Sequence, residues 1–175
     1  MKKRFEKINQ VNGELSLTGD KSISHRAVIF STLASGKSII KNISLGEDVK
    51  STLKIMQQLG AKVVNENKSI IIEGCGFKEF KKPTANLDCG NSGTSARLIC
   101  GLLAAQNFNS TLIGDESLSK RPMKRVIEPL KKMGVEFNSN ENLALPLTII
   151  PDPEIISIKY EMPVASAQVK SSILI

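Results

Sequence analysis

The sequence predicts a mixed α/β fold built by repeating one βαβαββ unit. The first observation is an internal similarity: the segment GDKSISHRAVIFSTLASG resembles the later segment GNSGTSARLICGLLAAQN. The second is a fixed spacing, because Arg26 and Arg97 are 71 positions apart and Gly60 and Gly134 are 74 positions apart. The third is that β-type and helix-type periodicity alternate in the same order in both copies. A long fixed period of this kind indicates a repeated structural unit.

The first unit is expected over residues 14–74. Residues 14–18 alternate apolar with polar side chains, which is the pattern of a strand with one buried face. Small polar residues then open a helix, which Ser22 or Ser24 is expected to cap and Gly36 is expected to end.

The rest of this unit predicts a strand, a helix and a hairpin. Residues 38–43 are rich in β-forming side chains, and acidic residues from Glu47 onward mark the positive end of a helix that Gly60 closes. Two short β-type runs flank the sequence NENK, as in a hairpin, and they cover 62–64 and 69–72.

A second unit repeats this order over residues 84–151. Its expected elements are a strand at 85–88, a helix at 92–105, a strand at 110–113, a helix at 123–133, and strands at 135–137 and 147–150. Small polar residues again precede an apolar helical run within 155–175, which we interpret as the start of a third unit. Residues 14–175 are therefore expected to form an incomplete first domain of a larger repeat protein.

An incomplete third unit has a consequence for packing. The apolar face that carries Leu98, Leu102 and Leu103 is expected to lose part of its cover. Because exposed apolar patches favour association and domain stability is small, we expect residues 1–175 alone to be marginally stable and prone to associate.

The charge balance favours anionic partners. The chain has 24 Lys and Arg against 17 Asp and Glu, a net charge of +7. This balance suits nucleic acid, acidic lipid or phosphorylated metabolites. Readers of single-stranded nucleic acid need aromatic stacking platforms, and the chain has no Trp, one Tyr and six Phe without such a pattern. The aromatic content therefore does not favour a reader of single-stranded nucleic acid.

Neither a membrane segment nor a metal site is expected. No apolar run reaches membrane-spanning length, and the basic N-terminus lacks the apolar stretch of a signal peptide. Cys75, Cys89, Cys100 and the one histidine do not have the spacing of zinc ligands. The composition predicts a cytoplasmic protein with reduced cysteines.

The motif GDKSISHR predicts an anion site at a helix N-terminus. Ser22 and Arg26 are four positions apart and share one helix face, and Lys21 lies at the helix mouth. Free N–H groups, a hydroxyl, a guanidinium and an ammonium together suit a phosphate or a carboxylate. The alternative is a capped helix with a surface arginine. His25 is either a base or a side chain with a satisfied partner in the first turn of the helix.

The motif CGNSGTSAR of the second copy predicts a similar helix N-terminus. Gly93 permits close backbone approach, or it serves helix–sheet packing. The segment lacks the G-K-[ST] ending of a Walker A loop and the spacing of a dinucleotide-binding loop. Arg121 precedes Pro122 in a loop, and a rigid loop arginine is more often functional than one on a helix surface.

Four motifs resemble the EPSP synthase family (3-phosphoshikimate 1-carboxyvinyltransferases): LTGDKSISHRA, LDCGNSGTSARL, GDESLSKRPM and PVASAQVKSSIL. They occur in the family's order and cover almost the whole chain. The resemblance implies an inside-out barrel of repeated βαβαββ units, with three units in each of two domains and substrates in the cleft between. Two such units and the start of a third are present here. Residues 1–13 would be a strand segment that leads from the second domain, which is absent.

The resemblance also implies a reaction of the shikimate pathway, in aromatic amino acid biosynthesis. Phosphoenolpyruvate transfers its enolpyruvyl group to shikimate 3-phosphate through a tetrahedral intermediate, and phosphate leaves. No metal or cofactor is needed. The family implies a monomer with small-molecule partners, without nucleic acid or membrane.

Residue roles follow from the resemblance alone. Lys21 would contact both substrates and assist proton transfer. The ligands of shikimate 3-phosphate would be Lys21, Ser22, Arg26, Ser166, Ala167 and Gln168. The ligands of phosphoenolpyruvate would be Lys21, Asn91, Gly93, Arg121 and Gln168.

The family's acidic general base belongs to the second domain. The chain is therefore expected to hold about half of the active site and to be inactive alone. A related alternative is the UDP-N-acetylglucosamine enolpyruvyl transferase, which typically has Lys-Asn at Lys21 and Ser22 and a reactive cysteine in the loop that here reads DESLSKRP. A non-catalytic module that binds anions or nucleic acid is the alternative from another class.

Overall fold

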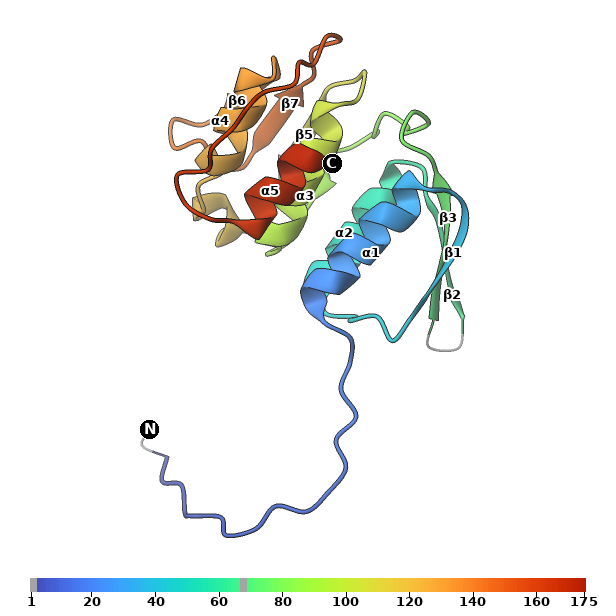
Figure 1. Cartoon of the computed structure of the whole chain (residues 1–175), viewed down its shortest axis with the longest axis vertical. Coiled ribbons are helices and arrows are strands. Elements are labelled where there is room, and N and C mark those ends of the chain that lie inside the picture. The colour runs from blue at the N-terminus through green and yellow to red at the C-terminus, as the bar shows by residue number, and fades with distance from the viewer. Residues whose placement is uncertain (1–2, 67–68) are drawn as a thin grey trace.

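Two small sheets and a set of helices make up the fold (Figure 1). The computed structural model describes residues 3–66 and 69–175. The first unit contains α1 (Lys21–Leu33), β1 (Ser35–Lys41), α2 (Glu47–Gln58), β2 (Lys62–Glu66) and β3 (Ser69–Cys75). The second contains β4 (Leu87–Asp88), α3 (Gly93–Ala104), β5 (Ser110–Ile113), the 3-10 helix η1 (Leu118–Lys120), α4 (Lys124–Lys132), β6 (Glu136–Ser139) and β7 (Leu147–Ile150). The chain ends with α5 (Ala167–Leu174).

Strand pairing agrees with the repeat that the sequence predicts. The first sheet has the order β1–β3–β2 and is antiparallel throughout. The second has the order β4–β5–β7–β6, in which β4 pairs parallel to β5 and the other pairs are antiparallel. The order β5–β7–β6 thus repeats β1–β3–β2. The glycines that follow α2 and α4 also correspond, since Gly60 has φ +116° and Gly134 has φ +104°.

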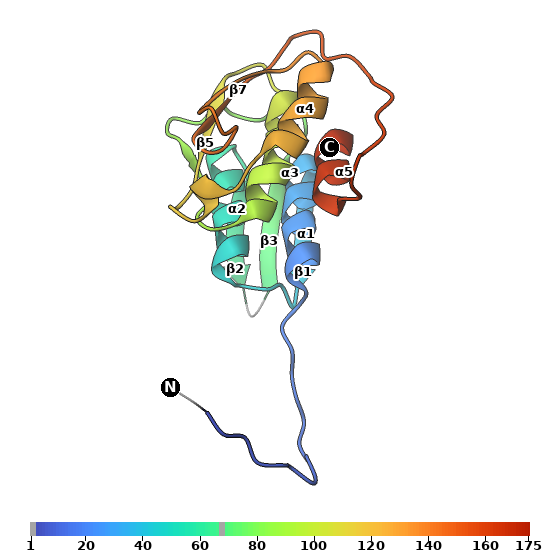
Figure 2. The same cartoon turned by 90° about the vertical axis from the view of Figure 1, so that its left-hand side faces the viewer.

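The core lies where the helices meet the two sheets. In both views α1 and α2 cover one face of the first sheet, and α3 lies between this helix pair and the second sheet (Figures 1 and 2). Leu98, Leu102 and Leu103 of α3 are 0% exposed. The expectation that these three side chains lose cover is wrong, because α5 packs directly on α3.

Gly101 of α3 explains this close packing. A Cβ added to Gly101 would lie 1.9 Å from the backbone oxygen of Ser172 on α5, so the two helices approach each other at a residue without a side chain. The short α5 therefore covers an apolar helix that we expected to be partly open.

The structure corrects two details of the first unit. Asp20, not Ser22 or Ser24, caps α1: its Oδ1 accepts a hydrogen bond of 2.8 Å from the Ile23 amide. The helix ends at Leu33, and Gly36 lies inside β1. Asp20 is the residue directly before the helix, so its carboxylate lies within reach of the amide of Ile23, the third helical residue.

The predicted strand over 14–18 is wrong for this structure. Residues 3–20 form neither helix nor strand, and Leu15 and Leu17 are 79% and 70% exposed. Alternation marks a segment able to lie on a sheet, but a strand forms only when a neighbouring edge supplies its hydrogen bonds. The strand expected in 1–13 is likewise not formed over residues 3–13; residues 1–2 lie outside the described residues, as do 67–68 in the predicted hairpin turn.

Within residues 3–66 and 69–175, no helix combines the length and apolar character needed to cross a membrane.

Candidate functional site

Three helix N-termini lie at one end of the helical layer. In both views α1, α3 and α5 run in the same direction (Figures 1 and 2). Each begins with a side-chain cap: Asp20 accepts from an amide of α1, Ser92 from one of α3 at 3.1 Å, and Ser166 from one of α5 at 3.3 Å. Because each N-terminus carries a partial positive charge and free N–H groups, this end of the layer favours anions. We call this end the three-helix face, and the N-terminus of each helix its mouth.

Lys21, Ser22 and Arg26 lie at the mouth of α1. Ser22 and Arg26 both lie in α1, four positions apart, so they share one helix face as predicted, and the Arg26 guanidinium donates to the Ser22 backbone carbonyl at 3.2 Å. The Lys21 ammonium forms an ion pair with Asp48 of α2 at 2.9 Å. Its side chain is 56% exposed, so the pair is open to solvent. This ammonium is held near the mouth and remains accessible to a ligand.

Gly93 and Arg97 form the mouth of α3. Nη1 of Arg97 donates to the Gly93 carbonyl at 3.2 Å, and a Cβ added to Gly93 would lie 2.6 Å from that nitrogen. Nη2 donates to the Pro122 carbonyl at 3.4 Å. Burial lowers the pKa of Arg97, and the neighbouring cations Arg121 and Arg125 lower it further. Arginine remains charged in proteins, so these groups concentrate positive charge at the mouth.

Arg121 reaches this mouth from the loop after η1. Its Nη2 donates to Asn91 Oδ1 at 2.6 Å, and its Nη1 donates to the Asn91 carbonyl at 3.4 Å. The Asn91 amide in turn donates to Asp115 at 2.6 Å, and this hydrogen bond is the main reason that the pKa of Asp115 is lowered. Asn91 therefore holds the guanidinium beside the start of α3.

The N-terminus of α5 joins the two mouths. Gln168 accepts from Arg97 at 3.2 Å and donates to Thr94 Oγ1 at 2.9 Å. Ser171, one turn further along α5, accepts from Arg26 at 3.1 Å. Ser166 and Ala167 lie at the cap and first position of the same helix. The structure thus gathers residues from the start, middle and end of the sequence at three adjoining helix starts.

His25 lies below this face. Its side chain is fully buried, and Nδ1 is 2.8 Å from the Thr52 hydroxyl. Burial lowers the pKa of His25 from 6.5 to about 4, and the cations Lys21 and Arg26 add to this against the opposing effect of Asp48. The imidazole is therefore neutral at pH 7, and its place in the core does not suit a base that acts on a ligand at the open face.

The predicted ligands do not include Arg97, Thr94, Asp48 and Ser171, which also lie at this face. Arg97 could have been found, because it is the repeat equivalent of Arg26 and ends the same motif. Asp48 and Thr94 carry no such signal, because an acid in the first turn of a helix and a small hydroxyl residue near a cap are common without function.

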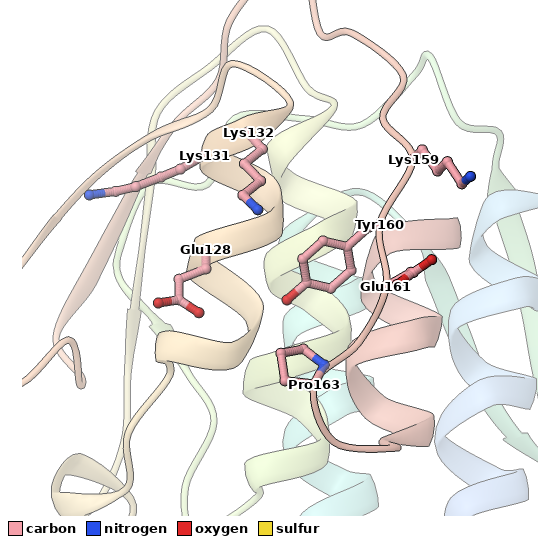
Figure 3. A pocket seen from close by; sticks show the side chains of 7 residues that line it. All are labelled: Glu128, Lys131, Lys132, Lys159, Tyr160, Glu161 and Pro163. Carbon is pink, nitrogen blue, oxygen red and sulfur yellow. The ribbon is translucent and has the colours of Figure 1, made fainter.

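The pocket in Figure 3 is separate from this face. Its volume is about 700 Å³, and α4 and the chain segment before α5 supply its walls. Lys132 Nζ lies 5.4 Å from the centre of the Tyr160 ring there. The lining residues are Glu128, Lys131, Lys132, Lys159, Tyr160, Glu161 and Pro163, and none of them is a predicted site residue.

The chemistry of the three-helix face is that of an anion site. Lys21, Arg26, Arg97 and Arg121 are cations at or beside helix starts, and the capping and glutamine side chains add neutral donors and acceptors. Paired guanidinium groups suit carboxylates and phosphates. No group of three His, Cys, Asp or Glu side chains suited to a metal ion is found in the part of the chain that the structure describes.

Comparison with known proteins finds the family that the four sequence motifs resemble. The sequence model of the EPSP synthase (3-phosphoshikimate 1-carboxyvinyltransferase) family matches residues 5–175. The 3-phosphoshikimate 1-carboxyvinyltransferase of Streptococcus gordonii is 47% identical over 165 residues, which cover 94% of this chain and 39% of that protein. The protein of the same name from Ruthia magnifica is 52% identical over 167 residues, which cover 95% of this chain and 38% of that protein.

A solved structure shows the same architecture. The EPSP synthase of Acinetobacter baumannii superposes with a TM-score of 0.88 at 41% identity, over 93% of this chain and 37% of that one. The chain therefore spans about two fifths of the length of the proteins that it matches.

Proposed function

The chain belongs to the EPSP synthase family, and from this premise we propose that its three-helix face serves the transfer of an enolpyruvyl group. The acceptor is shikimate 3-phosphate and the donor is phosphoenolpyruvate. A hydroxyl of the acceptor loses its proton as its oxygen bonds to C2 of phosphoenolpyruvate, and C3 takes up a proton as the C2–C3 double bond becomes single. The tetrahedral intermediate then loses phosphate from C2 and a proton from C3, which restores the double bond and leaves the enolpyruvyl ether. Both substrates are soluble metabolites, which favours a cytoplasmic protein.

One observation supports this proposal above the others: four cations and three helix N-termini lie on one face. Each substrate carries a phosphate and a carboxylate, so the pair brings four anionic groups. Helix starts and guanidinium groups bind such groups without reorganising during the reaction. The face therefore has several positive sites for several negative groups, whereas a single helix N-terminus would have only one.

The contacts suggest how the two ligands divide the face. Ser22, Arg26, Ser166, Ala167 and Gln168 lie on α1 and α5 and would hold shikimate 3-phosphate. Asn91, Gly93 and Arg121 lie at the mouth of α3 and would hold phosphoenolpyruvate, with Gln168 between the two.

Lys21 would contact both ligands. Its ion pair with Asp48 keeps the ammonium beside the mouth of α1 while most of the side chain stays open to solvent. Exposed ion pairs contribute little to stability, so a bound phosphate or carboxylate can replace Asp48 as partner at small cost. A solvent-accessible ammonium near both ligands can also assist proton transfer.

We further propose that the 175-residue chain binds shikimate 3-phosphate weakly and does not turn over. The chain matches about two fifths of the length of its relatives, and the family resemblance implies that the acidic general base belongs to the second domain. A ligand held from one side makes fewer charged contacts than one held from two.

Calorimetric titration with shikimate 3-phosphate tests the proposal. We expect saturable binding that Arg26→Met weakens by about tenfold, which corresponds to the loss of one charge-assisted hydrogen bond. Lys62→Met is the matched control, because Lys62 is an exposed cation of β2 paired with Glu73. Equal loss in both variants, or binding of DNA with a steep salt dependence in place of the metabolite, would contradict the proposal.

A further inference from the structure

A chain of buried polar side chains runs beneath the three-helix face. His25 Nδ1 is 2.8 Å from Thr52 Oγ1, which is 2.7 Å from Ser95 Oγ, which is 2.7 Å from Ser92 Oγ. All four residues are buried, and they come from α1, α2, α3 and the cap of α3. The chain is therefore a polar link between three helices inside an otherwise apolar layer.

The protons in this link have one consistent direction. Ser95 donates its one hydroxyl proton to one of two acceptors, Ser92 Oγ at 2.7 Å or the Asp48 carbonyl at 3.3 Å, and the Ser92 oxygen also accepts from the Ser95 amide at 3.1 Å. A hydroxyl has one proton, so Ser95 accepts from Thr52, and Thr52 accepts from the imidazole. The link therefore requires His25 to carry its proton on Nδ1. Among the residues that the structure describes, Nε2 of His25 has no hydrogen-bond partner.

Both ends of the link touch the candidate site. His25 lies between Lys21 and Arg26 on the first turns of α1, and Ser92 caps α3 one residue before Gly93. Hydrogen bonds in a buried network require a particular angle as well as a short distance between the groups. They therefore restrict the helices to one relative position, whereas apolar contacts alone would allow the helices to slide past each other.

We propose that His25 and Thr52 are positioning residues: the Nδ1–H tautomer of His25, through Thr52 and Ser95, holds the mouth of α1 in register with the mouth of α3. The inference rests on the proposed function, because its consequence is that a ligand spanning both mouths finds the cations of each at the right separation. A misplacement of about 1 Å in supporting residues is enough to impair such sites.

Three variants separate positioning from general support of the core. Thr52→Val keeps the shape and removes the hydroxyl, and Thr52→Ser keeps the hydroxyl and removes a methyl group. Thr32→Val is the matched control, because Thr32 is equally buried but its hydroxyl donates to the Val28 carbonyl of its own helix at 2.9 Å. All three are made in the 175-residue chain.

The first measurement is the ¹⁵N spectrum of the imidazole, which is unambiguous because the chain has one histidine. We expect the Nδ1–H tautomer in the unaltered chain, in Thr52→Ser and in Thr32→Val, and a tautomer mixture in Thr52→Val. Amide resonances of Ser22 and Gly93 should move in Thr52→Val alone. If Thr52→Val does not fold, Ser95→Ala cuts the same link and is judged by the same criteria.

The second measurement is the affinity for shikimate 3-phosphate at a temperature where every variant is folded. We expect Thr52→Val to weaken binding by about tenfold, a loss comparable to that of one buried hydrogen bond, and Thr52→Ser and Thr32→Val to stay within about twofold. An unchanged tautomer in Thr52→Val, or an equal loss of affinity in Thr32→Val, overturns the positioning role. If the unaltered chain does not bind the metabolite, the proposed function fails, and the imidazole and amide resonances still decide the positioning role.

Discussion

Gly101→Ala is expected to destabilise the chain although alanine is the better helix former. The added Cβ would lie 1.9 Å from the Ser172 backbone oxygen and 2.7 Å from its hydroxyl oxygen. Ordinary contacts between such atoms are more than 3 Å long, so α5 has to move away from α3 by about 1 Å or more. The clash is with backbone, which cannot be relieved by rotating a side chain.

The movement has a cost that can be estimated from the contacts of α5. Overpacking of this kind costs about 1–3 kcal/mol. The same displacement stretches the hydrogen bonds of Gln168 with Arg97 and Thr94 and that of Ser171 with Arg26, which are 3.2, 2.9 and 3.1 Å long. Each contributes about 0.5–1.5 kcal/mol. The higher helix propensity of alanine offsets about 1 kcal/mol of this cost, so the free energy of unfolding should fall by roughly 2 kcal/mol or more.

Urea unfolding followed by circular dichroism measures this change, and calorimetry with shikimate 3-phosphate measures the accompanying loss of affinity. Ser172→Ala combined with Gly101→Ala is the diagnostic control, because it removes the serine hydroxyl and leaves the clashing carbonyl. The double variant should remain as unstable as Gly101→Ala. A Gly101→Ala chain that is more stable than the unaltered one, as helix propensity alone predicts, would refute the packing of α5 on α3 described above.

Three further predictions concern single residues of the site and its support. Lys21→Met, in a polypeptide that carries this chain and catalyses the reaction, should lower turnover by about 10²–10⁴-fold with an unchanged fold, and more than a tenth of the original turnover would contradict its role. Gly93→Ala should weaken phosphoenolpyruvate far more than shikimate 3-phosphate, because the new Cβ meets Arg97 at 2.6 Å; an equal loss for both ligands in calorimetry would point to damage to α3 instead. The pKa of His25 is lowered from 6.5 to about 4, so its neutral form stabilises the fold fully above pH 6.5, and this stability is lost as the pH falls toward 4. Urea unfolding should show that the free energy of unfolding of the unaltered chain falls by about 3 kcal/mol more over that pH range than that of His25→Gln. The same pH dependence of unfolding in both chains would exclude this role of His25.

The sequence predicted elements whose signals are local. The strand Ser110–Ile113 was expected at the residues where it forms, and α3 and α4 begin and end within one residue of their expected limits. A run of β-formers or a capped apolar stripe defines such elements within a few residues. The segment 14–18 carries an equally regular pattern and forms no strand, because strand formation depends on a partner edge elsewhere.

The candidate site divides in the same way. Lys21, Ser22 and Arg26 lie within two turns of one helix, so their common face follows from helix geometry and could be inferred from spacing. The contact between Arg97 and Gln168 joins residues 71 positions apart, and that between Arg26 and Ser171 joins residues 145 positions apart. The sequence by itself therefore determined the repeated unit, the basic character and the residues able to bind anions. Only the tertiary structure decided that three helix starts share one face and that a buried histidine links two of them. Those placements arise from packing between segments that are far apart in the sequence, and their separation along the chain does not tell how close they lie in space.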